Sequence, residues 1–190
     1  MEKLEVGLNG CAFPMPCAIV GVEVNDRPNY LTIAWLTMVN SKPPYLGIAL
    51  GKTRYTNQGI RENGSFSVNI PSSNMVEVTD YCGVVSGDKF DKAQKFTTFY
   101  GKLKTAPMIK ECPYNLECRL IETVELPSNQ FFIGEIVAGY ADEQYLTNGV
   151  PDLKKIDPFV LSMAHARYFG IGEYLGKAWD IGKKCTAKKK

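Results

Sequence analysis

The chain has 190 residues, of which 45% are hydrophobic and 22% are charged, and its formal net charge is +2. This length suits one globular domain with a substantial core, while the small net charge argues against a nucleic acid or an anionic membrane as the main partner. No apolar run approaches the roughly 20 residues of a membrane-spanning helix, and residues 1–6 lack the apolar core of a signal peptide. We expect one cytoplasmic domain over residues 1–190, with residues 1–15 and 173–190 as peripheral terminal segments.

The first part of the chain has the pattern of a hairpin followed by a buried strand. Residues 16–25 alternate between apolar and polar positions, which is typical of a half-buried strand. The turn-forming residues 25–29 interrupt the pattern, and the β-branched and aromatic residues 32–39 resume it as the second arm of a hairpin. Residues 45–50 are continuously apolar, which predicts a strand buried on both faces.

A short helix and another strand come next. Thr53 or Thr56 is suited to cap a helix that carries Ile60, and residues 63–64, Asn-Gly, are a typical helix end. Residues 65–70 alternate cleanly and predict a further strand.

The second half of the chain is again dominated by strand patterns. Residues 75–82 predict a helix, and the glycine- and charge-rich residues 86–92 predict a surface loop. Further strands are predicted at residues 97–104, 116–124, 131–140 and 159–169. Because strands and long helices do not alternate, a doubly wound sheet is not indicated. About six or seven antiparallel strands favour a closed or split barrel, with a β-sandwich as the alternative that the pattern leaves open.

Cysteine and histidine usage limits the chemistry. The six cysteines include no Cys-x-x-Cys pair, so neither a zinc site nor a thioredoxin-type motif is indicated. In a cytoplasmic protein we expect most of them to be buried and reduced, with Cys185 as the best candidate for an exposed thiol. His165 is the only histidine, so any Ser-His-Asp or Cys-His catalyst would have to use it. We interpret it instead as a structural residue on the last strand, at a barrel rim.

A cluster of basic and hydroxyl residues precedes the first predicted helix. Residues 52–57 read Lys-Thr-Arg-Tyr-Thr-Asn. A helix N-terminus offers unpaired N–H groups and a partial positive charge, so Lys52 and Arg54 beside it predict an anion site, with Thr53, Thr56 and Asn57 as neutral donors. A capped helix with solvated basic residues explains the same pattern equally well.

The preceding hairpin offers a ring-binding surface. The Asn29 amide and the hydroxyls of Thr32 and Thr37 are suited to pair with the polar edge of a heteroaromatic ring, and Trp35 is suited to cover its face. The alternative is that Trp35 belongs to the core. Lys89 or Lys92 of the 86–92 loop is suited to reach such a ring or its phosphate, although a loop lysine is more often solvated.

Four segments in this order resemble the flavin reductase-like, FMN-binding split-barrel family. They are Asn-Tyr-Leu-Thr-Ile-Ala-Trp at 29–35, Lys-Thr-Arg-Tyr-Thr-Asn at 52–57, Thr-Asp-Tyr-Cys-Gly-Val-Val-Ser-Gly at 79–87 with Asp-Lys at 91–92, and Arg-Tyr-Phe-Gly-Ile-Gly at 167–172. The resemblance covers most of the chain from Cys17 to Gly172. It implies a mainly β fold, a six-stranded antiparallel Greek-key split barrel with a few short helices. It also implies a homodimer that binds FMN near the dimer interface.

Position by position, the resemblance implies roles for particular residues. Asn29 and Trp35 match residues that contact the isoalloxazine, and Lys92 matches a lysine that reaches the flavin. The phosphate-binding end is matched by Thr53, Arg54 and Thr56. The cofactor-binding candidates are Asn29, Tyr30, Leu31, Thr32, Trp35, Thr37, Lys52, Thr53, Arg54, Thr56, Asn57 and Lys92. Residues 129–131 lack a histidine that some relatives place near the flavin, which leaves substrate choice open.

The implied function is redox chemistry that belongs mainly to the cofactor. Hydride from NAD(P)H reaches flavin N5, so no side chain is required as an acid or base and no catalytic residue is expected. We therefore expect an FMN-dependent, NAD(P)H-dependent flavin reductase-like oxidoreductase. The alternative is a flavoredoxin-type electron-transfer protein that holds FMN tightly and exchanges electrons with a protein redox partner, without turning over NAD(P)H. A binding module that has lost the cofactor is a third reading.

Overall fold

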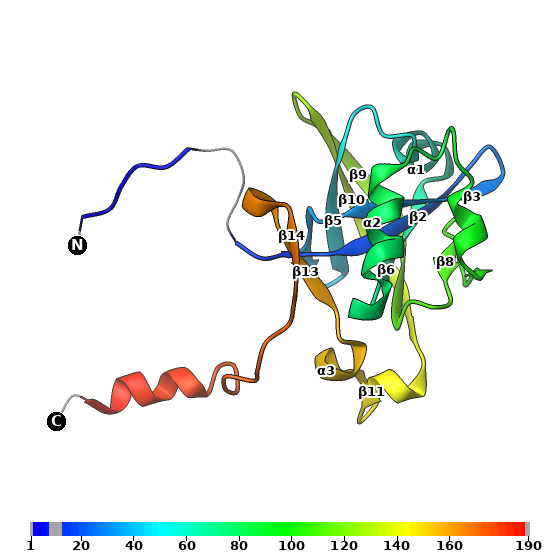
Figure 1. The fold of residues 1–190 in the computed structure, drawn as a ribbon. Coiled ribbons are helices and arrows are strands. Elements are labelled where there is room, and N and C mark those ends of the chain that lie inside the picture. The colour runs from blue at the N-terminus through cyan, green and yellow to red at the C-terminus, as the bar shows by residue number, and fades with distance from the viewer. Residues whose placement is uncertain (1, 8–12, 189–190) are drawn as a thin grey trace.

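One seven-stranded antiparallel sheet forms the centre of the computed structural model, which describes residues 2–7 and 13–188 (Figure 1). Its strands are β2 (Ala18–Val24), β3 (Arg27–Ile33), β4 (Leu36–Ser41), β5 (Pro44–Gly51), β6 (Ser65–Ile70), β9 (Tyr114–Glu125) and β10 (Asn129–Ala141). They are hydrogen-bonded in the order β3-β2-β6-β9-β10-β5-β4, so β3 and β4 are the two edges. Only Ala34 and Trp35 join these edges along the chain. The sheet must therefore curl so that its two edges approach each other at this connection.

This curled, open sheet is a split barrel. The mainly β fold class predicted from the sequence is confirmed, and the sandwich alternative is excluded. The sheet has seven strands instead of the expected six, because the run 32–39 is not one strand. It contains the end of β3, the break at Ala34 and Trp35, and most of β4. Residues on both sides of the break are good strand formers, so the pattern does not reveal it.

The β2–β3 hairpin turns more tightly than predicted. Asn25 and Asp26 have φ of 52° and 57°, and Val24 pairs directly with Arg27. Asparagine and aspartate tolerate this left-handed conformation, which a two-residue hairpin loop requires at both positions. Residues 27–29 therefore belong to β3 and not to the turn.

Two apolar clusters lie on opposite faces of the first strands. Inside the barrel, the largest buried side chains are those of Phe66 and Phe132. Outside it, Ile19, Tyr30 and Cys82 belong to a second buried cluster beneath helix α2 (Val76–Val84). Both faces of β2, β3 and β6 are therefore largely buried, which fixes the position of α2 against the barrel wall.

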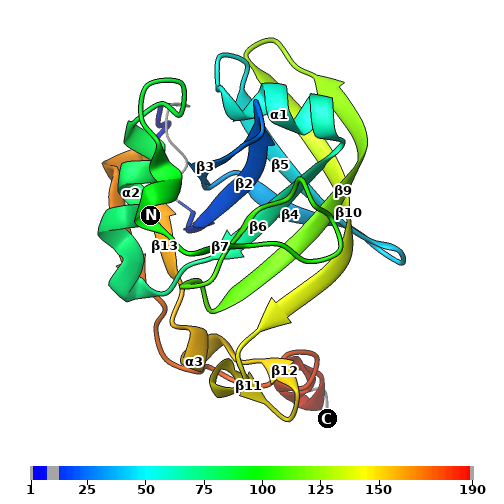
Figure 2. The same ribbon diagram turned by 90° about the vertical axis from the view of Figure 1, so that its right-hand side faces the viewer.

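The two predicted helices are present. Helix α1 (Thr56–Asn63) ends at Gly64, whose φ of 60° is the left-handed conformation that terminates a helix. The predicted capping role of Thr53 or Thr56 is wrong, because Tyr55 is the N-cap residue and no side chain caps the helix. Helix α2 follows the short 3-10 turn η1 (Ser73–Met75), close to the predicted 75–82. Figure 2 shows α1 at one end of the barrel and α2 along its side.

The predicted strand at 97–104 is mostly wrong. Only β7 (Thr98–Phe99) forms, paired with β8 (Met108–Ile109). The segment after it wraps around the buried carboxylate of Glu117, which accepts backbone N–H groups of Lys102 and Leu103 at 2.9 and 3.0 Å. These bonds replace the strand pairing that the sequence pattern suggested.

The predicted strand at 159–169 is also wrong as a single strand. It forms a hairpin of β13 (Phe159–Ser162) and β14 (Arg167–Gly170), and β13 also pairs with β1 (Met15–Pro16). The 3-10 turn η4 (Met163–His165) and the left-handed Ala166, with φ of 49°, reverse the chain. His165 therefore lies in an exposed turn and not on a strand at a barrel rim.

The remaining elements are short and peripheral. They are η2 (Lys92–Lys95), η3 (Glu143–Tyr145), β11 (Leu146–Thr147), β12 (Val150–Pro151), α3 (Leu153–Ile156) and η5 (Ile181–Lys188). Figure 1 shows the N-terminal segment and the segment that carries η5 leaving the barrel on the same side. No helix in the described ranges is long and apolar enough to cross a membrane.

The expected burial of most cysteines and the exposure of Cys185 are confirmed where these residues are described. Cys17, Cys82, Cys112 and Cys118 are buried free thiols, and Cys185 is exposed. Burial raises the pKa of Cys17 and Cys118 from 9.0 to about 12. Cys11 lies outside the described residues.

Candidate functional site

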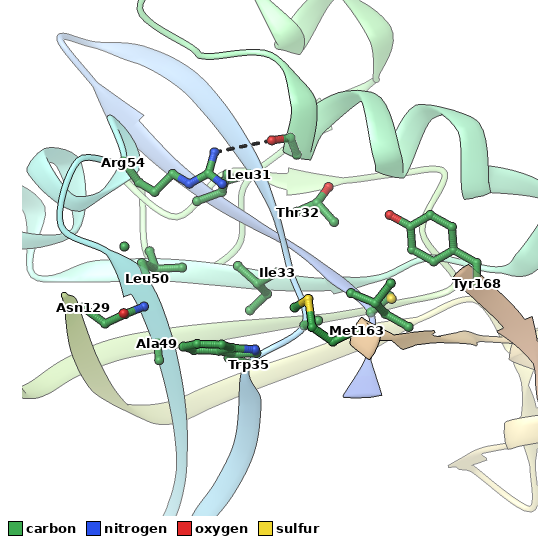
Figure 3. A pocket seen from close by; sticks show the side chains of 15 residues that line it. Leu31, Thr32, Ile33, Trp35, Ala49, Leu50, Arg54, Asn129, Met163 and Tyr168 are labelled. Atoms are coloured by element: carbon green, nitrogen blue, oxygen red, sulfur yellow. Dashed lines mark hydrogen bonds between the residues drawn. The ribbon is translucent and has the colours of Figure 1, made fainter. Parts of the chain in front are cut away.

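A cavity of about 390 Å³ lies where the β3–β4 connection, β5 and the β13–β14 hairpin meet (Figure 3). Its walls are mainly apolar and include Leu31, Ile33, Trp35, Leu50 and Met163. The first two come from β3, and Leu50 from β5, so the curled sheet itself provides one wall. Such a surface suits the flat face of a ring system.

Trp35 occupies this wall because of the break between β3 and β4. Its side chain is 47% exposed and lines the cavity, so the alternative that it belongs to the core is wrong. Its backbone carbonyl accepts the N–H of Ala49 at 3.0 Å, which ties the connection to β5. The indole is thereby held at the mouth of the cavity.

Arg54 lines the same cavity at the end opposite Trp35. Its backbone N–H donates to the Gly51 carbonyl at 3.0 Å, which forms a tight turn after β5. The guanidinium Nη1 faces the Gly83 carbonyl at the end of α2, at a distance of 3.4 Å (Figure 3). This single long contact leaves most of the donor capacity of the guanidinium available.

A second cavity, of about 490 Å³, lies on the other side of the Arg54–Tyr55 segment. Arg54 lines the first cavity and its neighbour Tyr55 lines the second, so the two cavities flank the same stretch of backbone. The second cavity is more polar, and its lining includes Arg27, Asn29 and Lys92.

Lys92 is buried, with 3% of its surface exposed, so the alternative of a solvated loop lysine is wrong for this residue. Its Nζ donates to the carbonyls of Cys82 and Val85 at 3.1 and 3.2 Å, at the C-terminal end of α2. Burial lowers the pKa of Lys92, and the positive charge of Arg54 contributes in the same direction. A buried cation beside a second cation is electrostatically costly, which favours the arrival of an anion.

Neither of these cations is neutralised by a neighbouring carboxylate. Within the described ranges, neither Arg54 nor Lys92 forms an ion pair, whereas Lys52 pairs with Glu125 at 3.2 Å. Asp88 also lines the second cavity, and its effect on the pKa of Lys92 is smaller than those of burial and of Arg54. The junction of the two cavities is therefore a site of positive charge.

The structure brings together some predicted site residues and separates others. Leu31, Thr32, Trp35 and Arg54 line the first cavity, and Asn29 and Lys92 line the second. The Asn29 amide is buried and donates from Nδ2 to Thr56 Oγ1 at 2.9 Å. Thr56 therefore supports Asn29 and lines neither of these two cavities.

Five further predicted residues lie elsewhere. Tyr30 is fully buried in the cluster beneath α2, because alternation along β3 turns it away from the barrel interior. Thr37 and Thr53 are exposed outside both cavities. Asn57 is buried, and its side-chain amide donates to the Gly51 carbonyl and to Gln130 Oε1. Lys52 is held against Glu125 by an ion pair. These contacts stabilise the turn before α1.

Sequence reasoning assigned no role to two residues of the first cavity and its surroundings. Tyr168 on β14 lines the cavity, and its hydroxyl donates to Asp80 Oδ1 on α2 at 2.7 Å. The Tyr168 ring packs edge-on against Phe159 at 5.4 Å. Tyr168 and Asp80 both belong to segments that match the family, but the 88 positions between them in the sequence conceal their pairing.

In residues 2–7 and 13–188, no group of three or more histidine, cysteine or acidic side chains is able to hold a metal ion.

Comparison with known proteins decides the family. Residues 10–171 match the family model described as "Flavin reductase like domain". The chain belongs to this family. The predicted family resemblance is therefore confirmed, and the match covers the whole barrel and the β13–β14 hairpin.

Solved structures agree with this assignment. Flavoredoxin from Methanosarcina acetivorans is 51% identical, with a TM-score of 0.95, and the alignment covers 97% of this chain and 100% of that one. Flavoredoxin of Desulfovibrio vulgaris (Miyazaki F) is 36% identical, with a TM-score of 0.89 and coverage of 95% and 100%. An FMN-binding protein from Thermus thermophilus shares the fold at 21% identity, with a TM-score of 0.78 and coverage of 93% and 98%.

Proposed function

We propose that this family member binds FMN and acts as an NAD(P)H-dependent flavin reductase-like oxidoreductase. The observation that carries the proposal is a pair of unneutralised cations, Arg54 and Lys92, beside an apolar cavity bordered by Trp35. FMN combines a planar ring system with a phosphate dianion, so it matches both halves of this arrangement. The name of the matching family and the name of the Thermus relative support the choice of ligand.

The apolar cavity is the proposed ring site. Leu31, Ile33 and Leu50 offer a flat wall from two strands, and Trp35 adds an aromatic edge at the mouth. These side chains exclude water from one side of a bound ring and restrict its orientation. Burying a ring of this size on apolar side chains supplies the larger part of the binding free energy.

The junction between the cavities is the proposed phosphate site. Arg54 offers a forked donor, and Lys92 offers a positive charge held in place by two carbonyls. The Asn29 amide, fixed by Thr56, adds a neutral polar group at the same junction. An anion here relieves the repulsion between the two cations, which gives this site its preference for phosphate.

The residues of the site bind and orient the cofactor and do not act as acids or bases. FMN, when bound, supplies the hydride-accepting and electron-transferring chemistry. The positive charge of Lys92 and Arg54 lowers the cost of placing negative charge in the neighbouring cavity. The protein thereby controls the affinity for the flavin and its tendency to be reduced.

The second candidate function is an electron-transfer protein of the flavoredoxin type. The observation that favours it is the 51% identity with the Methanosarcina protein, which is named a flavoredoxin. In this reading the site is the same and FMN stays bound. The two candidates differ only in whether a reduced nicotinamide or a protein redox partner delivers the electrons.

We also propose that the protein acts as a homodimer. Tyr174, Leu175 and Trp179 of the C-terminal segment are between 75% and 96% exposed, and Leu4 and Val6 of the N-terminal segment are similarly uncovered. Both segments leave the barrel on the same side (Figure 1). Exposed apolar side chains on extended segments favour contact with a second surface, and a second copy of this chain offers the same features in return.

Replacing Arg54 tests the proposed phosphate site. Arg54→Ala should weaken FMN binding roughly 10- to 150-fold, because a charge-assisted hydrogen bond contributes about 1.5–3 kcal/mol. Titration of the apoprotein with FMN, followed by quenching of flavin fluorescence, measures the change. Arg119→Ala is the matched control, because Arg119 lies on β9 in an exposed ion pair with Glu135. Equal affinities for both variants and the parent protein would remove Arg54 from the site.

Anaerobic mixing with reduced nicotinamide separates the two candidate functions. If the protein is a reductase, NADH or NADPH should bleach the visible absorbance of the bound flavin faster than that of free FMN at the same concentration. If neither nucleotide bleaches it but dithionite does, the electron-carrier reading holds and the reductase proposal fails.

The dimer proposal is tested by sedimentation velocity. The full chain should sediment as a dimer, with twice the monomer mass of 21.1 kDa. Trp179→Ser should shift the monomer–dimer equilibrium toward the monomer. Val84→Ser is the control, because Val84 is a comparably exposed apolar residue on the barrel side, in α2. A monomeric parent protein at micromolar concentration would contradict the proposal.

A further inference from the structure

Two hydroxyl groups break the apolar lining of the first cavity. Thr32 on β3 and Tyr168 on β14 both line it, and Figure 3 shows both on the side of the cavity nearest α2. They come from segments 136 positions apart, and each is held by a contact with α2. We call Thr32 and Tyr168, with the contacts to α2, the hydroxyl corner.

Both hydroxyl groups donate their hydrogen bonds to acceptors within the protein. The Tyr168 hydroxyl donates to the carboxylate of Asp80 at 2.7 Å, and the Thr32 hydroxyl donates to the backbone carbonyl of Thr79. A carboxylate and a carbonyl can only accept, so the direction of both bonds is fixed. Each hydroxyl oxygen keeps lone pairs, and neither has a proton left to offer to a ligand.

The acceptor character of the corner is stable around neutral pH. Partial burial raises the pKa of the Tyr168 hydroxyl above its usual value of 10.0, and the hydrogen bond to Asp80 raises it further. The neighbouring thiol of Cys17, which also lines the cavity, has its pKa raised to about 12 by burial. Tyr168 therefore stays a neutral hydroxyl that accepts, and the Cys17 thiol beside it stays protonated.

We propose that Thr32 and Tyr168 form an acceptor-only corner that recognises an N–H group on the edge of a planar ring bound in this cavity. The inference rests on the proposed function, since it concerns which ligand the same cavity selects. A ring edge that presents only carbonyl oxygens or a methyl group finds no donor here and leaves the corner unpaired, which is costly in an apolar cavity. Two relevant rings carry such an N–H, namely the imide of the flavin and the carboxamide of a nicotinamide.

Matched ligand pairs identify the source of the N–H. FMN is compared with its N3-methyl derivative, which keeps the ring and phosphate and lacks the imide N–H. NAD⁺ is compared with its 3-acetylpyridine analogue, which keeps the carbonyl and lacks the amide N–H donors. Calorimetric titrations measure equilibrium affinities, the first pair with the apoprotein and the second with the oxidised, flavin-loaded protein. In at least one pair, the ligand with the N–H should bind about 2- to 10-fold more tightly.

Two variants connect this preference to the corner. Tyr168→Phe keeps the ring that packs against Phe159 and should reduce the preference to nearly equal affinities. Asp80→Ala alters an exposed helix residue and leaves the hydroxyl in place, but frees its proton to donate. This variant should lower the preference or reverse it toward the methylated or acetyl ligand. Tyr100→Phe is the control, because it removes a similar tyrosine–carboxylate bond, to Glu23 at 2.6 Å, outside the cavity.

The outcomes are distinguishable. A preference that the two corner variants lose and the control keeps supports the inference, and the ligand pair that shows it names the source. If FMN binds but neither pair shows a preference, or if the preference survives both corner variants, the inference fails and the proposed function stands. If FMN does not bind to the parent protein at all, both fail.

Discussion

The two-residue connection between β3 and β4 is the constraint on which the rest of the structure depends. These strands are the edges of the sheet, yet only Ala34 and Trp35 separate them, so the sheet has to curl. The Trp35 carbonyl is bonded to Ala49 of β5, and the Trp35 side chain, which is 47% exposed, lies at the rim of the resulting opening. The curling of the sheet and the aromatic wall of the cavity thus have one cause.

Helix α2 links this barrel to the charge of the site. Its C-terminal carbonyls hold the ammonium of Lys92, its Gly83 carbonyl faces Arg54, and its Asp80 holds Tyr168. The buried cluster beneath the helix, which includes Tyr30, fixes the position of all three contacts. A single packed helix therefore positions both the two cations and the hydroxyl corner.

The sequence predicts those parts of the molecule that depend on local pattern. The strands around 16–25 and 65–70 follow from alternation, and the end of α1 follows from Gly64. Features set by distant contacts are not predictable in this way. Local pattern alone does not separate Lys92 from a solvated loop lysine, because the carbonyls that hold it lie at the C-terminal end of α2. Tyr168 shows its role only once the fold brings it to Asp80. The family resemblance pointed to Lys92 but assigned no role to Tyr168.

The most direct test of the account is a crystal structure of the protein soaked with FMN. The account predicts a flavin ring in the cavity beside Trp35 and a phosphate within hydrogen-bonding distance of Arg54. Density for FMN at any other place, or a cavity that stays without flavin at saturating concentration, would contradict it.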